Sequence, residues 1–306
     1  MRDSKSVIEV VNSFGFKKIV GPSILAFSQW ASATEGGGSM YPPGVESWMS
    51  GALPPPGFYG VVYAQNYRAD VLRGNDGEKL PVDFDLKANV VAPRFIWVTD
   101  YHVLGGQLAL HTIIPLVDLR VSVGGEHDRK QGLGDITFGP GLGYHYGENL
   151  HVVYGVDFYA PTGRYDRNDL ANLGRNYWTA QAVVAMTYAD PDGFNADAKI
   201  MYGANSKNTD TDYKSGQEFI IDYAVGWAVA AGWVAGVGGY YYQQTTDDYQ
   251  HGDRVNDNKG KSFAIGPAIK YSSPHGWSLA AKWQREDYVK NRPEGDAFWL
   301  KLAFKY

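Results

Sequence analysis

The side chains that could carry chemistry are spread thinly along this sequence. The chain has no cysteine, which excludes disulfides, thiol catalysis and cysteine-ligated metals. None of its seven histidines is followed two positions later by serine, and it has no Gly-x-Ser-x-Gly or His-Glu-x-x-His motif. Glu126-His127-Asp128 combines metal-ligand types, but in its polar stretch it is better interpreted as a solvated charge cluster. We therefore expect no enzyme, no metal and no bound cofactor.

A second group of ionisable side chains alternates with apolar residues. Charges at every second position of an apolar strand can face a polar lumen while their neighbours face lipid. These lumen candidates are Asp83, Asp85, Lys87, His111, Arg120, Asp157, Asp197, Lys199, Glu218, Asp222, Lys270, Lys282 and Lys301. Two interpretations stay open, because the charges could pair and fill the interior or line a narrow channel and set its selectivity. Their nearly balanced signs disfavour a pore for sugar acids or phosphate.

Composition narrows the class of protein. The 306 residues carry a net charge of −5, which argues against a general nucleic-acid binder. A mean hydropathy of −0.33 argues against a bundle of membrane helices. The high content of aromatic residues and glycine is typical of an outer-membrane barrel and also fits a soluble β-sandwich. The pattern along the chain has to decide between them.

The first 33 residues have the pattern of an export signal. Basic residues precede an apolar run over Ile19–Trp30, which ends in Ala31-Ser32-Ala33. The run is shorter than the ~20 residues that a membrane-spanning helix needs. We predict a signal peptide over residues 1–33, cleaved after Ala33; a buried amphipathic helix is the alternative.

An irregular lead-in, residues 34–57, is followed by runs of period-two alternation that continue to the last residue. The predicted strands are Phe58–Asp70, Val82–Trp97, Gly106–Val123, Gly134–Tyr146, Leu150–Thr162, Asn176–Tyr188, Phe194–Tyr202, Gln217–Trp227, Trp233–Gln244, Lys261–Tyr271, Trp277–Tyr288 and Ala297–Tyr306. Tight turns alternate with long polar loops, as in outer-membrane barrels. We predict an all-β fold, a transmembrane antiparallel barrel of twelve strands over residues 58–306. An even strand number places both termini on the short-turn, periplasmic side.

The last strand ends on an aromatic residue. Phe304 and Tyr306 close a run of apolar residues at every second position. This ending resembles the C-terminal signal read by the barrel assembly machinery, and an ordinary closing strand is the alternative. We expect the assembly machinery to be a partner of this chain.

Several prolines and glycines lie inside the predicted strands, where proline cannot donate to the ladder. They are Pro93, Pro115, Pro140 and Pro267, with a glycine stripe at Gly139, Gly141 and Gly143. The apolar face changes parity around Pro115, which is typical of a bulge. These residues either relieve crowding in a small barrel or form a kinked wall with a gap.

Short segments spread over the whole chain resemble a known family. They are Tyr41–Glu46, Leu53–Tyr59, Gly132–Ile136, Ala160–Asp166, Asn172–Trp178 and Ile265–Pro267. In this order they are similar to the outer-membrane channel family named for the meta-pathway of phenol degradation. The resemblance implies a monomeric twelve-stranded barrel in a Gram-negative outer membrane. It also implies uptake of small hydrophobic, often aromatic, compounds, without catalytic residues.

Three functional hypotheses follow. The leading one is a passive channel for small hydrophobic solutes that leave sideways through the kinked wall. The second is a narrow diffusion pore for small polar or ionic solutes, and the third is a structural barrel with a blocked lumen. In each case the expected surroundings are outer-membrane lipid and lipopolysaccharide. The lead-in should fold into or under the barrel, because its apolar side chains are costly to leave in water.

Overall fold

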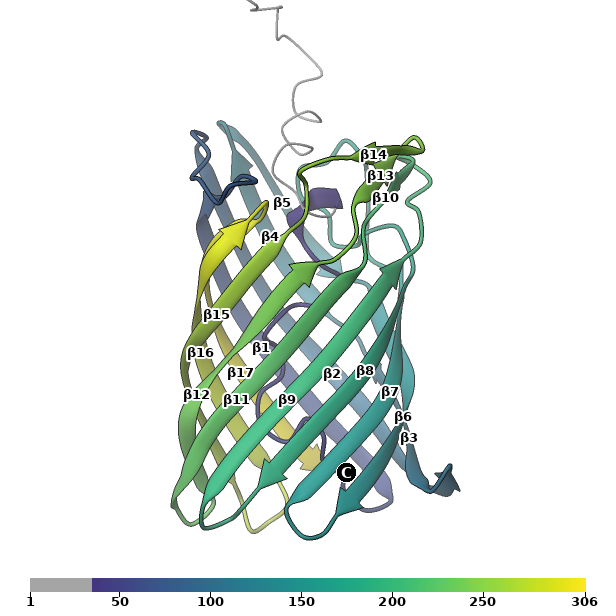
Figure 1. Cartoon of the computed structure of the whole chain (residues 1–306), viewed down its shortest axis with the longest axis vertical. Coiled ribbons are helices and arrows are strands. Elements are labelled where there is room, and N and C mark those ends of the chain that lie inside the picture. The colour runs from purple at the N-terminus through teal and green to yellow at the C-terminus, as the bar shows by residue number, and fades with distance from the viewer. Residues whose placement is uncertain (1–34) are drawn as a thin grey trace, which may run out of the picture.

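The computed structural model describes residues 35–306, which form a closed antiparallel β-barrel (Figure 1). Its ring has twelve strands, and it closes because β1 pairs with β17 on one side and with β2 on the other. This confirms the predicted all-β barrel. The predicted signal peptide lies outside the described residues. Within the described part of the chain, no helix is long and apolar enough to cross a bilayer.

The ring strands agree with the predicted ones to within a few residues over most of the chain. They are β1 (Gly57–Leu72), β2 (Phe84–Val103), β3 (Gly106–Ile113), β6 (Ile136–Tyr146), β7 (Leu150–Ala160), β8 (Thr179–Ala189), β9 (Phe194–Asn205), β11 (Glu218–Ala230), β12 (Trp233–Gln244), β15 (Lys261–Ser272), β16 (Ser278–Lys290) and β17 (Pro293–Lys305). The elements outside the ring are η2 (Glu35–Gly37), β4 (Leu116–Val123), β5 (Glu126–Leu133), β10 (Tyr213–Lys214), β13 (Asp248–Gln250) and β14 (Asp253–Val255).

The two ends of the barrel differ. Short turns join the strands at one end, whereas long loops and the small sheet β10-β13-β14 lie at the other (Figure 1). Tyr306 lies at the short-turn end, where its N–H donates to the carbonyl of Phe58 at 3.1 Å. Glu35 lies among the long loops, where its N–H donates to Ser215 Oγ at 3.3 Å. Between these two ends the lead-in therefore runs lengthwise through the lumen, and the periplasmic placement of both termini stays a prediction.

One side of the barrel is interrupted, and the prediction of a single strand over Gly106–Val123 is wrong there. The stretch forms β3 and β4, which are separated at Ile114 and Pro115 because proline has no N–H for the ladder. β2 pairs with β4 along its first half and with β3 along its second. Among the described residues, β5 pairs only with β4, so its other edge has no partner strand. We call β2–β6 the interrupted wall.

The lead-in, described over residues 35–56, fills the lumen with irregular chain (Figure 1, purple). Its Tyr41 and Trp48 are only 4% and 2% exposed. Tyr41 packs with Tyr159 and Ile220, while Trp48 packs beside small alanines of the surrounding strands. The interior of the barrel is therefore occupied by the chain's own lead-in rather than by side chains of the strands alone.

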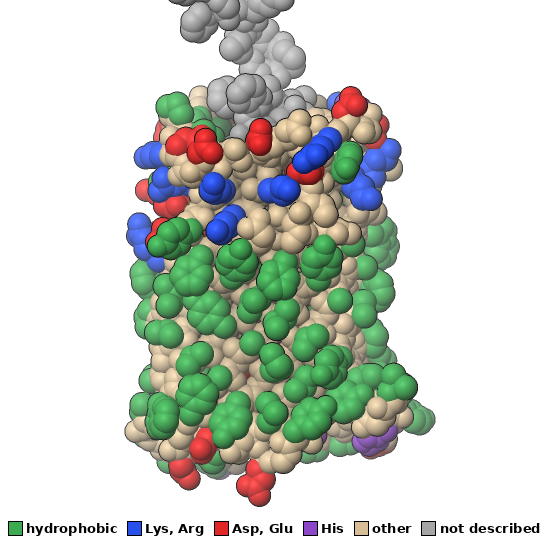
Figure 2. Space-filling view, viewed as in Figure 1, with side chains coloured by type: hydrophobic (Ala, Val, Ile, Leu, Met, Phe, Trp, Pro, Cys, Tyr) green, Lys and Arg blue, Asp and Glu red, His purple; other side chains and the backbone are tan. Residues whose placement is uncertain are grey.

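The outer surface is apolar around the middle of the barrel. Figure 2 shows hydrophobic side chains over most of the viewed wall, with charged side chains gathered towards the long-loop end. Aromatic contacts such as Tyr271 with Trp233 and Trp277 add to this apolar surface. Such a band fits a lipid environment, in which apolar residues face the acyl chains and aromatics mark the interfaces.

Candidate functional site: a lumen cavity beside the interrupted wall

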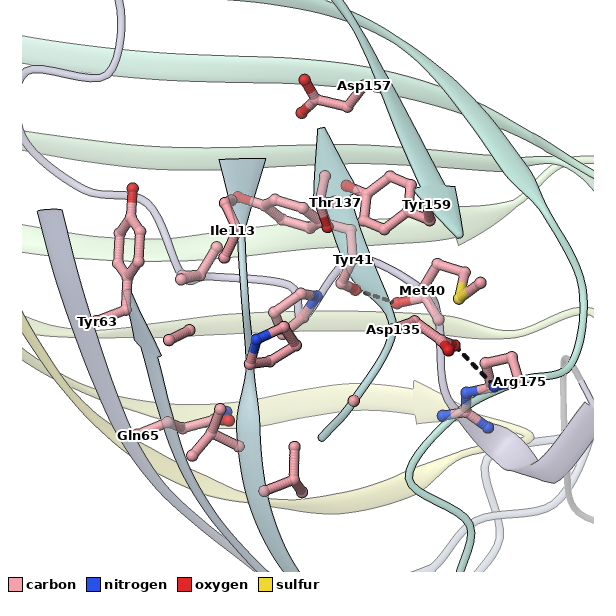
Figure 3. Close-up of a pocket in the computed structure, with 18 of the residues that line it drawn as sticks. Met40, Tyr41, Tyr63, Gln65, Ile113, Asp135, Thr137, Asp157, Tyr159 and Arg175 are labelled. Atoms are coloured by element: carbon pink, nitrogen blue, oxygen red, sulfur yellow. Dashed lines mark hydrogen bonds between the residues drawn. The ribbon is translucent and has the colours of Figure 1, made fainter. Parts of the chain in front are cut away.

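A cavity of about 230 Å³ lies in the lumen between the lead-in and the interrupted wall. Figure 3 shows ten of its lining residues, which are Met40, Tyr41, Tyr63, Gln65, Ile113, Asp135, Thr137, Asp157, Tyr159 and Arg175. Apolar groups from Val45, Val90, Pro115, Val117 and Leu173 also line it, as do the charged Glu46 and Lys199. The cavity therefore combines aromatic and aliphatic surfaces with a few polar groups, as small-molecule sites commonly do.

The lead-in is held on one side by Asp222 of β11. The carboxylate of Asp222 accepts hydrogen bonds from Tyr41 Oη at 2.5 Å, from the N–H of Gly44 at 2.7 Å and from the N–H of Glu46 at 2.9 Å. Lys282 of β16 donates to the carbonyls of Gly44 and Glu46 at 2.6 and 2.8 Å. These buried bonds satisfy backbone groups that an irregular segment cannot pair with itself.

Glu46 ties the same segment to the other side of the barrel. Its carboxylate accepts from Lys301 Nζ at 2.6 Å, from Tyr63 Oη at 2.7 Å and from Arg94 Nη1 at 3.2 Å. Lys301 also donates to the carbonyl of Trp48 at 3.1 Å. The lead-in thus connects β11 and β16 with β17, β1 and β2 across the lumen.

Two further contacts fix the lead-in nearer the short-turn end. Asp197 Oδ1 accepts from the N–H of Ser50 at 2.8 Å, and Thr187 Oγ1 accepts from the N–H of Gly51 at 2.9 Å. A second cavity of about 50 Å³ lies beside this part of the segment, lined by Leu53, Arg94 and His111 among others. A path along the barrel axis therefore narrows below the larger cavity.

A loop, residues 161–178, covers the free edge of the interrupted wall. Asp135, between β5 and β6, accepts from the N–H of Gly163 at 2.9 Å and from the N–H of Arg175 at 2.7 Å (Figure 3). Leu173 and Pro115 lie against Gly134, the last residue before Asp135. The wall is therefore closed at this point by one loop and a few side chains, not by a ladder of strands.

Most of the predicted lumen residues face inward. Seven of them are buried, namely Asp157, Asp197, Lys199, Glu218, Asp222, Lys270 and Lys282, and two are half-buried, His111 and Lys301. Several of them pair with each other or with the strands: Asp157 lies 2.9 Å from His111 Nε2 and 3.7 Å from Lys199 Nζ. Glu218 accepts from Tyr242 Oη at 2.7 Å. The buried charges therefore fill the interior and hold the lead-in.

Asp83, Asp85, Lys87 and Arg120 do not face the lumen, contrary to the prediction. Asp85 and Lys87 form an exposed ion pair of 3.0 Å on β2, and Lys87 is paired in register with Arg120 on the same outward face. Asp83 is exposed just before β2. The reason is their position along the barrel axis. These residues stand beyond the apolar band, where outward side chains meet water and can be charged.

The prolines singled out in the sequence have different surroundings. Pro93, Pro140 and Pro267 lie inside β2, β6 and β15, whereas Pro115 alone of the four stands between two strands. Of the glycine stripe, Gly139 leaves no room for a side chain beside the carbonyl of Val156, Gly141 lies beside Val153, and Gly143 faces Leu53 of the lead-in. The glycines therefore accommodate neighbouring chain, and the break in the wall is at Pro115.

The two residues of the predicted assembly signal lie at the end of the last strand. Phe304 belongs to β17, and its ring contacts that of Tyr306 with the centroids 5.3 Å apart. Tyr306 is largely exposed at the short-turn end. Recognition of this ending by the assembly machinery stays a prediction.

Sequence reasoning did not identify the groups that close the interrupted wall. Asp135, Gly163, Leu173 and Arg175 all belong to segments that carried the family resemblance, but no spacing along the chain indicated their contacts. Glu46 was likewise part of a matching segment without an assigned role. Residues 35–306 contain no group of three or more histidine, aspartate or glutamate side chains arranged to hold a metal ion.

Comparisons with known proteins agree with this architecture. The family model described as "Putative MetA-pathway of phenol degradation" matches residues 69–302. An outer membrane channel of the COG4313 group from Pseudomonas putida F1 superposes with a TM-score of 0.72 at 23% identity, covering 88% of this chain and all of the other. The translocator domain of the autotransporter NalP from Neisseria meningitidis gives 0.50 at 9% identity, covering 84% and 91%.

The structural likenesses establish the fold, which is that of bacterial outer-membrane barrels. No curated protein matches the sequence. The family match extends over more than half of the chain and includes both the interrupted wall and the loop that covers it. The chain belongs to the family described as "Putative MetA-pathway of phenol degradation".

Proposed function

We propose that this protein is a passive outer-membrane channel for small hydrophobic, mainly monoaromatic, compounds, and that its long loops face the outside. The observation that carries the proposal is the cavity of about 230 Å³ at the break in the wall. An apolar cavity of ~150 Å³ in an engineered protein is large enough for benzene. One monoaromatic molecule therefore fits, with its ring between Ile113 and Val90 and its polar substituent near Thr137 or Tyr159.

The same cavity suggests how the solute leaves. Pro115, Gly134 and Leu173 line the cavity and also form the closure of the interrupted wall. Phe138 and Trp178, whose rings contact each other edge-on, stand exposed near that closure. A small displacement of Leu173 would join the cavity to the apolar outer surface without breaking any hydrogen bond between strands. An apolar solute leaving there enters lipid directly.

The second candidate is a narrow pore for polar or ionic solutes along the barrel axis. It is favoured by the cavity of about 50 Å³ further along the lumen, which shares Glu46, Asp157 and Lys199 with the larger one. The lead-in occupies this axis and is bonded on both sides, so axial passage requires its displacement. This cost makes the sideways route the better-supported proposal.

Substitutions of Leu173 separate the two routes. Leu173→Ala should raise the initial uptake rate of a phenolic compound into cells that lack other channels, and Leu173→Trp should lower it, each by about twofold or more. Leu170→Ala, in the same loop but outside the cavity lining, is the matched control and should leave uptake unchanged. The ion conductance of the purified channel should stay the same in all three. Unchanged uptake together with altered conductance would support the axial pore instead.

A further inference from the structure

A row of basic side chains crosses the outer surface of the interrupted wall and its neighbours. We define the basic row as Arg285 of β16, Arg68 of β1, Lys87 of β2, Arg120 of β4 and Arg129 of β5. The strand register pairs each member directly with the next, except that Asp296 of β17 stands between Arg285 and Arg68. Neighbouring strands lie ~4.8 Å apart, so Arg68, Lys87, Arg120 and Arg129 form a continuous strip, and Arg285 lies beyond Asp296 at its end.

The cations of this row are exposed and only partly compensated. Arg129 forms a two-pronged bond with Asp118 at 2.9 and 3.0 Å, and Lys87 pairs with Asp85. The guanidinium groups of Arg68 and Arg285 form no hydrogen bond or ion pair with any described residue, and both side chains are exposed. Their guanidinium groups are therefore free to bind a ligand from outside.

The row stands directly above the apolar band. On β16, Arg285 follows the exposed Trp283 by two residues, and on β5, Arg129 precedes Leu133 by four. Two same-face residues are ~6.6 Å apart along a strand, which places the lower part of the row within the headgroup layer. Arg285 lies nearest the apolar band, whereas Lys87 stands four residues from the exposed Val91.

The strands of the opposite side of the barrel carry no such row. Along β8, β9, β11 and β12, the outward positions carry only uncharged side chains, and the charges of these strands face the lumen. The basic row is therefore built from strand positions on one side of the barrel, next to the apolar band.

We propose that the basic row is a docking site for the phosphorylated headgroup of lipopolysaccharide, with Arg285, Arg68 and Lys87 binding its lipid A phosphates. Guanidinium groups bind phosphate through two parallel charge-assisted hydrogen bonds. Below them, exposed Trp283, Phe298 and Val91 offer an apolar surface for the acyl chains. The proposal rests on the orientation proposed above, in which the long-loop end faces outside, but it does not depend on what the channel transports.

The test compares two triple variants of the folded barrel in detergent. The first is Arg68→Gln/Lys87→Gln/Arg285→Gln. The matched control, Arg167→Gln/Lys214→Gln/Arg254→Gln, removes the same number and kinds of exposed cations from the long-loop end outside the row. Native mass spectrometry measures the Kd for bisphosphorylated lipid A, for dephosphorylated lipid A and for phosphatidylglycerol. Heat-modifiable mobility verifies that each variant is folded.

Each Lys or Arg near an anionic membrane surface contributes to the binding free energy. The first variant, which lacks three of them, should therefore bind bisphosphorylated lipid A at least about tenfold more weakly. The control variant should stay within about twofold of the parent, and dephosphorylated lipid A should bind all three proteins equally weakly. Equal losses in both variants, or an equal loss for phosphatidylglycerol, would show general anion attraction and overturn the proposal. Phenol uptake should be unaffected in the first variant, so a failure of the transport proposal would be recognised separately.

Discussion

The two sides of this barrel differ in structure. The continuous wall, β7, β8, β9, β11 and β12, has uncharged outward positions and buried inward charges such as Asp157, Asp197 and Asp222. The interrupted wall, β2–β6, breaks at Pro115 and is covered by a loop instead of a strand. The continuous wall therefore holds the lead-in through Asp197 and Asp222, whereas the interrupted wall borders the cavity and is completed by a loop. A channel needs both, because a solute path is useful only if the rest of the lumen stays closed.

The largest effect is expected at the anchor on the continuous wall. Asp222→Ala removes the acceptor of three buried hydrogen bonds, and breaking such a buried charge site costs about 3–5 kcal/mol. The free energy of unfolding of the purified barrel, measured in urea, should fall by this amount, and the ion conductance should rise as the lead-in loosens.

Asp118→Ala on the outer surface of the interrupted wall is the control for this substitution. Its carboxylate pairs with Arg129 in solvent, where an ion pair contributes little to stability. If both variants lose the same stability, the anchoring role of the continuous wall is wrong.

A smaller, local effect is expected at the interrupted wall. Asp135→Ala removes the acceptor for the N–H groups of Gly163 and Arg175, and each unsatisfied group costs about 1–3 kcal/mol. The loop should open more often, so trypsin should cut the folded barrel faster after Arg164 and Arg167. Asp192→Ala, in a turn at the other end of the barrel, should leave the cleavage rate unchanged. Equal cleavage of parent and Asp135→Ala would contradict the role of this loop as a movable cover.

The smallest effect is a pH dependence at the long-loop end. Asp248 accepts hydrogen bonds from Tyr213 Oη and the N–H of Gly216, both at 2.6 Å, and burial raises its pKa to about 6. The folded protein thus holds a proton that the unfolded chain releases near its ordinary value of 3.8, so stability falls as pH rises from about 4 to 6.

Hydrogen exchange of β10 and β13 should consequently be faster at pH 7 than at pH 5, after correction for the intrinsic rate. The variant Asp248→Asn should lose most of this difference. If the variant kept the full difference in β10 and β13, the pH response would not come from this carboxyl group.

How much of the fold and of the candidate site could be predicted from the sequence depends on what surrounds each residue. Inside the apolar band, charged residues such as Asp222 and Lys282 face inward because lipid excludes them, so alternation predicted both their strands and their direction. Beyond the band this reasoning fails, as Lys87 and Arg120 show, because water accepts charges on either face. β5 was missed for the same reason, since its outward Arg129 and Gln131 give no apolar alternation.

The closure of the wall could not be predicted from local pattern. The contact of Asp135 with Gly163 and Arg175 joins residues 28 and 40 positions apart, through backbone N–H groups that any residue provides. The parity change around Pro115 did indicate an irregularity, but whether it would be a bulge or a complete break depends on the loop that covers it.

The position of a bound solute tests the central claim most directly. Crystals soaked with a bromophenol would reveal the bromine by its anomalous scattering. We predict a peak in the cavity beside Pro115 and Leu173, and its loss in Leu173→Trp. A peak in the smaller cavity near Arg94 and His111, unchanged in that variant, would contradict the account and place the path along the barrel axis.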